Sequence, residues 1–296
     1  MKKWWIYQKE RFPLIEYVPM ILAFAISGLN YTARLIGQMH TLQVTHYLVG
    51  SITMLIWFML MRIADEHKDY EEDKKYRPYR AIPRGLITLK ELRYLGIILI
   101  GLQLGLTFWF NPSLLPILLL SYLWFGLISI EFGVAHWLKK QHTLYLLSHT
   151  LMMVMISIYL TGIVWTLHKF PINMVPYLLS GYLLGLVFEI GRKLRAPSEE
   201  EKGVETYTVV WGIKKAVISW LICVSLSFIS IVVSSWIIGL NHIILIVFTP
   251  LYVIVCYGAI CFIKAPTQKK SIFFKLFSAV WLLLVYVVLG IISWLF

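Results

Sequence analysis

Long apolar runs, separated by short polar segments, fill most of the chain. A helix needs roughly 20 predominantly apolar residues to cross a bilayer, and nine runs approach or exceed that length. They lie at about 17–37, 43–63, 94–111, 114–132, 145–166, 172–190, 215–238, 242–263 and 274–295. Asn111-Pro112-Ser113 separates the third run from the fourth and predicts a tight hairpin. The pattern therefore predicts an all-α, polytopic membrane protein with nine transmembrane helices.

The composition agrees with this pattern. The 296 residues are 59% hydrophobic and only 14% charged, and the mean hydropathy is +0.75. A soluble core of this size does not need so apolar a composition, so a soluble protein is excluded. No Ser/Gly linker or low-complexity tract interrupts the sequence. We therefore expect residues 1–296 to form a single domain.

The charged residues predict the orientation in the membrane. All of the 27 Lys and Arg residues except Arg34 and Lys169 lie at the N-terminus or beside the loops after even-numbered helices, and all 15 Asp and Glu lie on that side too. The positive-inside rule then places the N-terminus and both acidic segments in the cytoplasm and the C-terminus outside. We expect an integral protein of the cell's inner membrane whose basic side meets anionic lipid. Nucleic acid is not an expected partner, because the basic residues are divided among short loops.

A charged segment follows the second apolar run. Asp65, Asp69 and Asp73 recur every four residues. A helix turns about 100° per residue, so each lies roughly 40° from the last, and Glu66 falls within the same arc of roughly 100°. Four carboxylates on one face repel each other unless a cation lies between them. Oxygen-only clusters suit Mg²⁺, or Mn²⁺, better than Zn²⁺. We assign all four a catalytic, metal-binding role.

Three arginines follow these carboxylates. Arg77, Arg80 and Arg84 are spaced by Pro78 and Pro83. Fixed cations beside ligands for a hard metal indicate a metal-bridged phosphate or diphosphate, which we expect the arginines to bind. The alternative is a solvated juxtamembrane helix followed by a positive-inside loop. The regular four-residue step and the proline-spaced arginines favour the binding site.

A second charged segment follows the sixth apolar run. Glu189 and Asp65 each end an even-numbered predicted helix, and each is followed by a basic stretch and then a glycine, Gly203 or Gly85. This correspondence predicts two pseudo-repeated halves of four helices, with a ninth helix appended, arranged as a bundle around one central cavity.

The second segment supplies further candidate site residues. We expect Glu189 and Glu199 to bind metal, and Arg192 and Lys193 to bind substrate. A bound cation would bridge the two acidic clusters, which otherwise repel each other. Glu189 and Lys193 also form an i,i+4 pair in the favourable orientation, so a plain salt bridge at a solvated helix end is the alternative.

The first segment resembles a known motif. Asp65-Glu66-x-x-Asp69-x-x-x-Asp73 is similar to the first Asp-rich motif of the UbiA-type membrane prenyltransferases, Asn-Asp-x-x-Asp-x-x-x-Asp. The similarity continues into the family's Lys/Arg-Pro-x-Arg-Pro-Ile-Pro-x-Gly, which corresponds here to Arg77-Pro78-Tyr79-Arg80-Ala81-Ile82-Pro83-Arg84-Gly85. The family's later Gly-Lys-x-Thr-Leu-Pro-Val-x-x-Gly fits Gly203-x-x-Thr206-x-x-Val209-x-x-Gly212. Two motifs on inner loops and nine helices extend the resemblance over the whole chain.

This resemblance implies a fold and an activity. The family folds as an all-helical bundle around a lipid-open cavity, in which two Mg²⁺ ions hold a polyprenyl diphosphate against the two motifs. The prenyl group passes to a small lipophilic or aromatic acceptor. Carried over by position, the four carboxylates of the first segment would be metal ligands. Arg77 and Arg80 would contact the diphosphate or order the loop.

The chain departs from the family pattern at several positions. Asp65 stands for the usual Asn, Glu66 for the usual Asp, and Ala81 for a Pro. The family's second motif is an Asp-x-x-x-Asp pair, whereas here Glu189 is followed by Lys193. A lysine there could bind the diphosphate directly in place of a metal.

Two other functions remain open at this point. The same fold could cyclise an ionised prenyl diphosphate without an acceptor, as a terpene cyclase. A non-enzymatic transporter or lipid-binding protein would instead carry ionisable residues near mid-membrane, and no carboxylate lies at that depth. Asn30, His46 and His149, which lie in apolar runs, are expected to make hydrogen bonds between helices.

Overall fold

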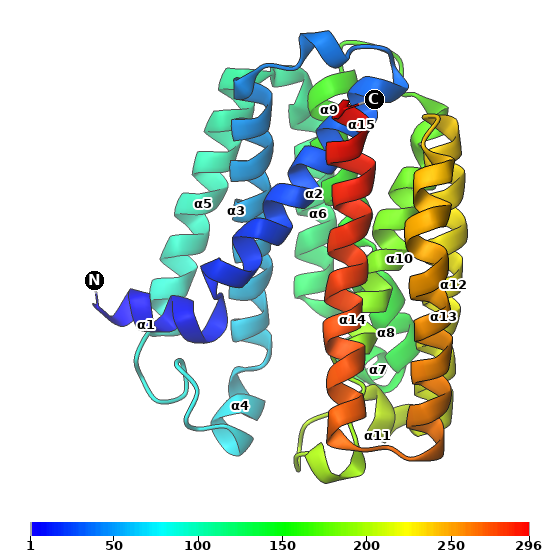
Figure 1. Ribbon diagram of the computed structural model, residues 1–296. Coiled ribbons are helices and arrows are strands. Elements are labelled where there is room, and N and C mark those ends of the chain that lie inside the picture. The colour runs from blue at the N-terminus through cyan, green and yellow to red at the C-terminus, as the bar shows by residue number, and fades with distance from the viewer. Residues whose placement is uncertain (1, 296) are drawn as a thin grey trace.

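The computed structural model describes residues 2–295, and within that range it consists of helices and their connections, with no strand (Figure 1). Nine segments of the described chain are long and apolar enough to cross a membrane, which confirms the predicted number. They are formed by α2 (Leu14–Leu35), α3 (Val44–Lys68), α5 (Leu89–Phe110), α6 (Leu115–Ser129), α8 (His142–Thr150) with α9 (Met152–Trp165), α10 (Val175–Gly191), α12 (Ile213–Ile237), α13 (Asn241–Lys264), and α14 (Gln268–Tyr286) continued by the π-helical turn η6 (Val287–Ile292) and α15 (Ser293–Leu295).

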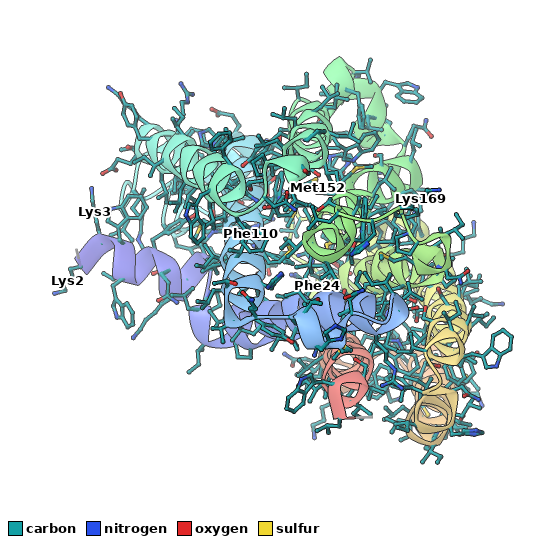
Figure 2. The ribbon with its side chains drawn as sticks, turned by 90° about the horizontal axis from the view of Figure 1, so that it is seen from above. Lys2, Lys3, Phe24, Phe110, Met152 and Lys169 are labelled. Carbon is teal, nitrogen blue, oxygen red and sulfur yellow. The ribbon has the colours of Figure 1, made fainter. Side chains whose placement is uncertain are left out.

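Short helices connect these spans. They are α1 (Lys2–Arg11), α4 (Tyr70–Tyr76), α7 (Ala135–Lys140) and α11 (Tyr207–Trp211), together with the 3-10 turns η1 (Met39–Thr41), η3 (Glu131–Gly133) and η5 (Pro197–Glu199). The 3-10 turns η2 (Pro112–Leu114) and η4 (Ile172–Met174) begin the spans of α6 and α10. Figure 2 shows α1, with Lys2 and Lys3, extending sideways from the bundle.

The start of the third span differs from the apolar pattern. Helix α5 begins at Leu89, five residues before the apolar run at 94. The Thr88 hydroxyl accepts a hydrogen bond from the Glu91 backbone N–H at 3.2 Å, and the Glu91 carboxylate accepts one from the Thr88 N–H at 2.9 Å. This capping box starts the helix within the polar loop. The predicted hairpin is confirmed, since Asn111 accepts a hydrogen bond from the Ser113 N–H at 3.0 Å.

The packing places helices α2 and α10 in the interior. Helix α2 packs on α3, α9 and η6, and α10 packs on α9, α12 and α14. In the apolar stretch of each of the spans of α5, α6 and α13, only 22% of the residues are buried, against 61% in the span of α10. Helices α5, α6 and α13 therefore form the lipid-facing periphery.

Both acidic segments lie at the same end of the bundle. In Figure 1, α1, α4 and α11 lie toward one end, and the C-terminus lies at the other. We call the end with α4 and α11 the charged end. This arrangement agrees with the distribution of Lys, Arg, Asp and Glu along the sequence.

The π-helical turn is joined to two other helices by a polar contact. The Asn30 side chain donates a hydrogen bond to the Gly290 carbonyl at 3.0 Å and accepts one from the Tyr47 hydroxyl at 2.6 Å. The interhelical hydrogen bonds predicted for Asn30 are therefore confirmed, whereas the His46 ring bonds within its own helix, where Nδ1 accepts from the Gln43 N–H at 3.1 Å. The backbone at Gly290 also runs directly against α2, because a Cβ there would lie 2.5 Å from the Ser27 Cα.

Replacing Gly290 by alanine is expected to destabilise the bundle. Overpacking of this kind costs about 1–3 kcal/mol, so the thermal unfolding midpoint in detergent should fall by several degrees. Gly101→Ala is the matched control, because an added Cβ there meets nothing within 4 Å and alanine is favoured in a helix. If Gly290→Ala unfolded at or above the midpoint of the control, the close approach of η6 to α2 would be wrong.

Candidate functional site

Asp65 and Asp69 present open carboxylates at the charged end. Asp65 lies on the last turn of α3, and its side chain is 53% exposed. Asp69 joins α3 to α4 and is exposed as well. The nearest cation to Asp65 is Arg62, whose Nη1 lies 4.0 Å from Oδ2, at the limit of an ion pair. Both carboxylates therefore keep oxygens available for a ligand.

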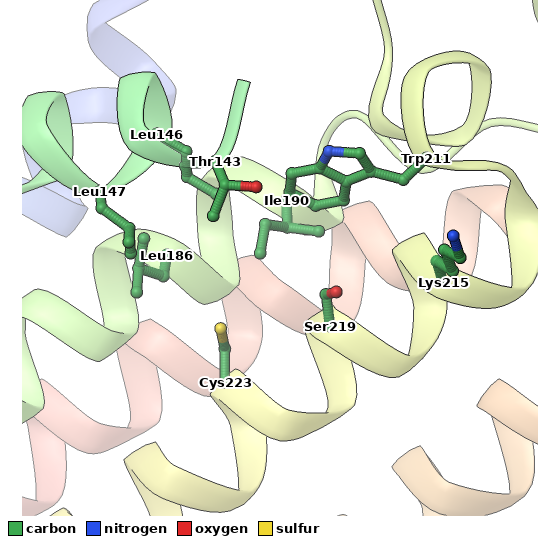
Figure 3. A pocket seen from close by; sticks show the side chains of 9 residues that line it. All are labelled: Thr143, Leu146, Leu147, Leu186, Ile190, Trp211, Lys215, Ser219 and Cys223. Carbon is green, nitrogen blue, oxygen red and sulfur yellow. The ribbon is translucent and has the colours of Figure 1, made fainter. Parts of the chain in front are cut away.

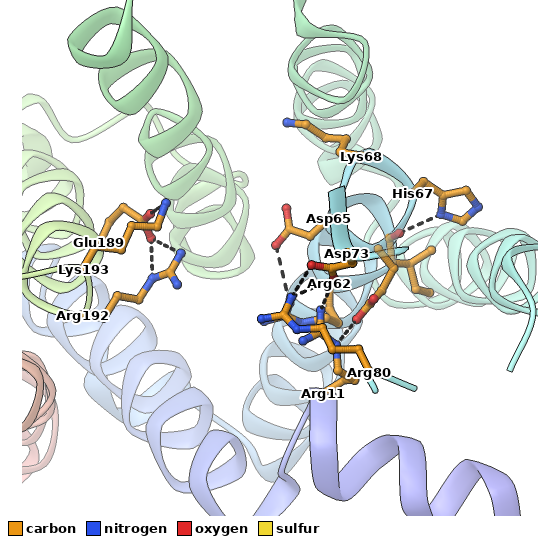
Figure 4. Close-up of polar contacts among 12 residues, drawn as sticks. Arg11, Arg62, Asp65, His67, Lys68, Asp73, Arg80, Glu189, Arg192 and Lys193 are labelled. Carbon is orange, nitrogen blue, oxygen red and sulfur yellow. Dashed lines mark hydrogen bonds and ion pairs between the residues drawn. The ribbon is translucent and has the colours of Figure 1, made fainter. Parts of the chain in front are cut away.

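Glu66 and Asp73 have a different environment. Their side chains are only 2% and 3% exposed. The Arg11 guanidinium, from α1, lies 2.5 Å from Glu66 Oε1 and 3.8 Å from Asp73 Oδ2. Arg80 Nη1 donates to both oxygens of Asp73, at 2.9 and 2.7 Å (Figure 4). These two carboxylates are bound by arginines of the protein itself.

The expectation of one shared cluster of four carboxylates is therefore corrected. Helical geometry places Asp65 and Asp69 toward one edge of the arc, and Glu66 and Asp73 toward the other, roughly 80–100° from Asp65. The first edge is open, whereas the second faces Arg11 and Arg80. An arc of this width is wide enough for its two edges to face different neighbours.

The three arginines after the first segment form ion pairs within the protein. Arg77 Nη1 lies 3.3 Å from Asp73 Oδ1, and Arg84 Nη2 lies 2.7 Å from Glu10 Oε1. Arg80 pairs with Asp73 as described. Their loop is anchored by the buried Ala81 and by Ile82 and Ile87, which pack in a small core with Tyr7 of α1. Of the two roles predicted for Arg77 and Arg80, these contacts correspond to ordering of the loop.

Helix α1 completes this side of the site and was not recognised in the sequence. Besides the Arg11 contacts, Lys3 pairs with Glu91 at the start of α5. Burial, and secondly the Glu66 carboxylate, raise the pKa of the Tyr7 hydroxyl, so this phenol stays neutral beside the ion pair. The basic character of α1 was a possible signal, but its partners lie far away in the sequence.

The second segment carries a carboxylate held by two cations. Arg192 Nη2 and Nε lie 2.5 and 2.6 Å from Glu189 Oε2, and Lys193 Nζ lies 3.0 Å from Oε1. Lys193 also lies 5.5 Å from the centre of the Tyr207 ring. Burial alone would lower the pKa of Arg192, but the Glu189 carboxylate, and more weakly Asp65, raise it. Two cations share one carboxylate here, so the group of Glu189, Arg192 and Lys193 keeps a net positive charge. Arg192 also interacts electrostatically with Asp65.

Glu199 does not join Glu189. Its Oε2 accepts hydrogen bonds from the Ala196 backbone N–H, at 3.1 Å, and from the Ser271 hydroxyl of α14. These contacts close the turn η5 onto α14. Glu199 therefore stabilises its own loop. Glu189 is not among its contacts, so the two predicted metal ligands of the second segment do not lie together.

A groove separates the two segments. It has a volume of about 650 Å³ and is lined on one side by Glu71, Glu72, Lys75 and Tyr76, and on the other by residues 201–205 and 209. A Cβ added at Gly203 would lie only 2.6 Å from the carbons of the Tyr76 ring, and Gly203 has φ +78°. A glycine is needed here both for this backbone conformation and for the close approach of the ring.

A second groove, of about 310 Å³, opens between α8, α10 and α12 (Figure 3). Its walls are mostly apolar, and they include Leu186, Ile190 and Trp211, with Lys215 as the one charged lining residue. Ile190 is adjacent in sequence to Glu189. The groove therefore offers an apolar surface close to the second segment.

The open carboxylates fit a hard cation. Among residues 2–295, no group of three His, Cys, Asp or Glu side chains is arranged as a complete metal site. Mg²⁺ in proteins is commonly held by only one or two carboxylates, with water and substrate phosphate completing its shell. Asp65 and Asp69 match that requirement. Glu66, Asp73 and Glu189 fit it less well, because arginine or lysine already neutralises them.

Comparison with known proteins agrees with the fold and the motif. A sequence model described as the UbiA prenyltransferase family matches residues 21–284. No curated protein matches the chain. A solved structure described as "Structural and mechanistic insights into the biosynthesis of Digeranylgeranylglyceryl phosphate synthase in membranes" has 17% sequence identity and a TM-score of 0.64, and the match covers 99% of each chain. At that identity the likeness shows the fold alone. The match of the family model over most of the chain shows that it belongs to the UbiA prenyltransferase family and is an intramembrane prenyltransferase.

Proposed function

We propose that the chain transfers a prenyl group from a prenyl or polyprenyl diphosphate to a lipophilic acceptor, with an aromatic ring as the favoured class, and that a divalent cation assists the reaction. The observation that carries this proposal is the pair of open carboxylates, Asp65 and Asp69, at the same end of the bundle as the Arg192 and Lys193 cations, with Asp65 close enough to Arg192 for their charges to interact. Carboxylates for a hard metal and fixed cations together are suited to a diphosphate.

The reaction follows from this charge arrangement. The carbon–oxygen bond of the donor breaks, its electron pair stays on the diphosphate, and an allylic cation remains. In this proposal Arg192 and Lys193 stabilise the charge that develops on the leaving group. Mg²⁺ or Mn²⁺ on Asp65 and Asp69 would supply further neutralisation. The acceptor then forms a bond to the allylic carbon, and an aromatic acceptor loses a ring proton.

The charged end also suggests how the donor lies in the membrane. We propose that this end, with the N-terminus and both acidic segments, faces the cytoplasm of the cell, because the Lys and Arg residues concentrate there. The diphosphate would remain at this end, while the apolar prenyl chain would extend among the helices. The groove beside Ile190 gives such a chain an apolar surface near Glu189.

Product analysis tests the proposed reaction. Membranes containing the chain are supplied with prenyl diphosphates of several lengths and a pool of aromatic and phosphate-bearing acceptors, and the products are identified by mass spectrometry. A prenylated acceptor with stoichiometric release of diphosphate supports the proposal. Cyclised hydrocarbons formed from purified protein and donor alone would instead identify a terpene cyclase.

Asp69→Ala is expected to abolish turnover while the protein stays folded and inserted. Loss of one ligand in a hard-metal site should reduce the rate by roughly 10² to 10⁴. Glu16→Ala, at an exposed carboxylate on α2, is the control and should keep its activity. A folded Asp69→Ala protein with more than about a tenth of the wild-type rate would rule out metal binding at this position.

Activity is expected to require Mg²⁺ or Mn²⁺ and to be lost on chelation. The open ligands are oxygen donors, and none of the three cysteines lies in either segment. Adding magnesium back to chelated membranes should restore product formation. Activation by zinc but not by magnesium would contradict the assignment of Asp65 and Asp69.

Lys193→Ala and Lys193→Asp are both expected to weaken binding of the donor. Each removes an ammonium beside the proposed diphosphate position, and aspartate also adds negative charge next to Glu189. A simple i,i+4 pair at a helix end contributes only about 0.2–0.5 kcal/mol. Donor affinity is measured with a non-reactive prenyl diphosphate analogue. Changes below about twofold, or roughly 0.4 kcal/mol, in both variants would favour the simple salt bridge.

A further inference from the structure

Lys68, on the last turn of α3, lies in a polar cluster that the proposed reaction does not yet use. Its Nζ donates to the Tyr145 hydroxyl at 2.9 Å and lies 3.1 Å from Nε2 of His149. A third contact, to the Ile128 carbonyl, is long at 3.4 Å. The close partners of this ammonium are therefore neutral groups.

Two ammonium groups of the cluster share its nearest carboxylate. Glu131 Oε1 lies 3.6 Å from Lys68 Nζ and 4.0 Å from Lys139 Nζ, and neither contact is a close hydrogen bond. The Asp65 and Asp69 carboxylates act on Lys68 from farther away. The Lys68 side chain is only 15% exposed. A largely buried ammonium whose nearest carboxylate is shared with a second ammonium is costly, and an anionic ligand would lower that cost.

Tyr145 adds a hydrogen-bond donor beside this ammonium. Its oxygen accepts from Lys68, and no acceptor for its own hydroxyl hydrogen is found among residues 2–295. Tyr145 is half-buried, so its hydroxyl is not sealed within the core. The phenol can donate this hydrogen to an oxygen atom that also contacts Lys68.

The cluster is rigidly held. The Tyr145 and His149 rings stack with their centres 3.8 Å apart and an angle of 14° between their planes, and His149 Nδ1 lies 2.9 Å from the Tyr145 carbonyl. Glu131 and Phe132 have φ of 52° and 55°, and Gly133 follows at 73°. Positive φ in two consecutive non-glycine residues is strained, and such strain is concentrated at functional sites.

The position of this cluster separates it from the cations assigned to the donor. Lys68 lies roughly 60° around α3 from Asp65. Figure 4 shows Lys68 on the opposite side of Asp65 from Arg11 and Arg80, with the Arg192–Lys193 pair on a different helix. We infer that Lys68 and Tyr145 bind an anionic oxygen group, a carboxylate or a phosphate, carried by the acceptor substrate. This inference rests on the proposed prenyl transfer.

Matched acceptor pairs test this inference. Membranes containing the full chain receive prenyl diphosphates with hydroxybenzoate or hydroxynaphthoate, each paired with its methyl ester, and with glycerol phosphate paired with glycerol. The product made from the membrane's own acceptor is identified in parallel by mass spectrometry. We expect prenylation of acidic acceptors in strong preference to their uncharged partners. Equal use of the uncharged partner, or a natural product without an acidic group, would overturn the inference.

Variants then locate the anionic group. Lys68→Met should raise the acceptor KM by at least about tenfold while the donor KM changes by less than about twofold. Tyr145→Phe should raise the acceptor KM by about threefold or more, and Lys68→Arg should recover part of the loss. Lys90→Met, at an exposed lysine on α5, is the control and should change neither constant. Thermal unfolding of each variant checks its fold, and Tyr145→Phe keeps the test available if Lys68→Met is unstable.

The remaining outcomes are also decisive. A rise in the donor KM instead of the acceptor KM would mean that Lys68 binds the diphosphate, and unchanged constants would make the cluster purely structural. Either result overturns the acceptor site and leaves the proposed prenyl transfer intact. Formation of no prenylated acceptor in any combination would contradict the proposed function itself, and the acceptor site with it.

Discussion

A charged side chain in the hydrocarbon core of a membrane costs several kcal/mol, and most features of this protein follow from that cost. All 15 carboxylates lie at or beside the segments of the charged end, and the spans between consist almost wholly of apolar and small hydroxyl residues. The charged groups available for chemistry are therefore confined to one end of the bundle. The proposed donor would obey the same rule, because its diphosphate is excluded from lipid and its prenyl chain is excluded from water.

Charge at that end is balanced by groups from distant parts of the chain. Arg11 of α1 neutralises Glu66, Arg80 neutralises Asp73, and Arg192 with Lys193 neutralises Glu189. Asp65 and Asp69 are exceptions in the first segment, since they remain open. Selective neutralisation of neighbouring carboxylates thus gives a run of similar residues distinct surroundings.

The helical framework was predictable because its determinants are local. Each span is encoded by its own apolar run, and the hairpin by Asn111-Pro112-Ser113. Even the early start of α5 has a local signal, the spacing of Thr88 and Glu91, which the apolar pattern alone does not show. Properties that depend on one segment can be derived from the sequence of that segment.

The site was predictable only in part, because its contacts join distant segments. Helical geometry gave the directions of Asp65 and Glu66 relative to α3, but it could not show that Arg11, 55 residues from Glu66, lies opposite the latter. The environment of Lys68 depends in the same way on Glu131. Its positive φ could not be expected from the sequence, because Glu131 is not a glycine. Arg192 and Lys193 were both recognised as candidate cations of the second segment, but the sequence did not show that Arg192 shares the Glu189 carboxylate with Lys193.

The contacts of α1 have a consequence for the order in which the protein is made. The partners that fix Glu66 and Asp73, namely Arg11 and Arg80, all lie within the first third of the chain. A nascent chain leaves the ribosome N-terminus first, and its early parts fold first. The ion pairs of Glu66 and Asp73 can thus form once three spans are inserted, because α1 is already present at the membrane surface. Lys68 gains its partners only after the fifth span begins, and the second segment follows later. During synthesis, Asp65 and Asp69, the carboxylates that would hold the metal, therefore reach their places before Arg192 and Lys193, the cations that would bind the departing diphosphate.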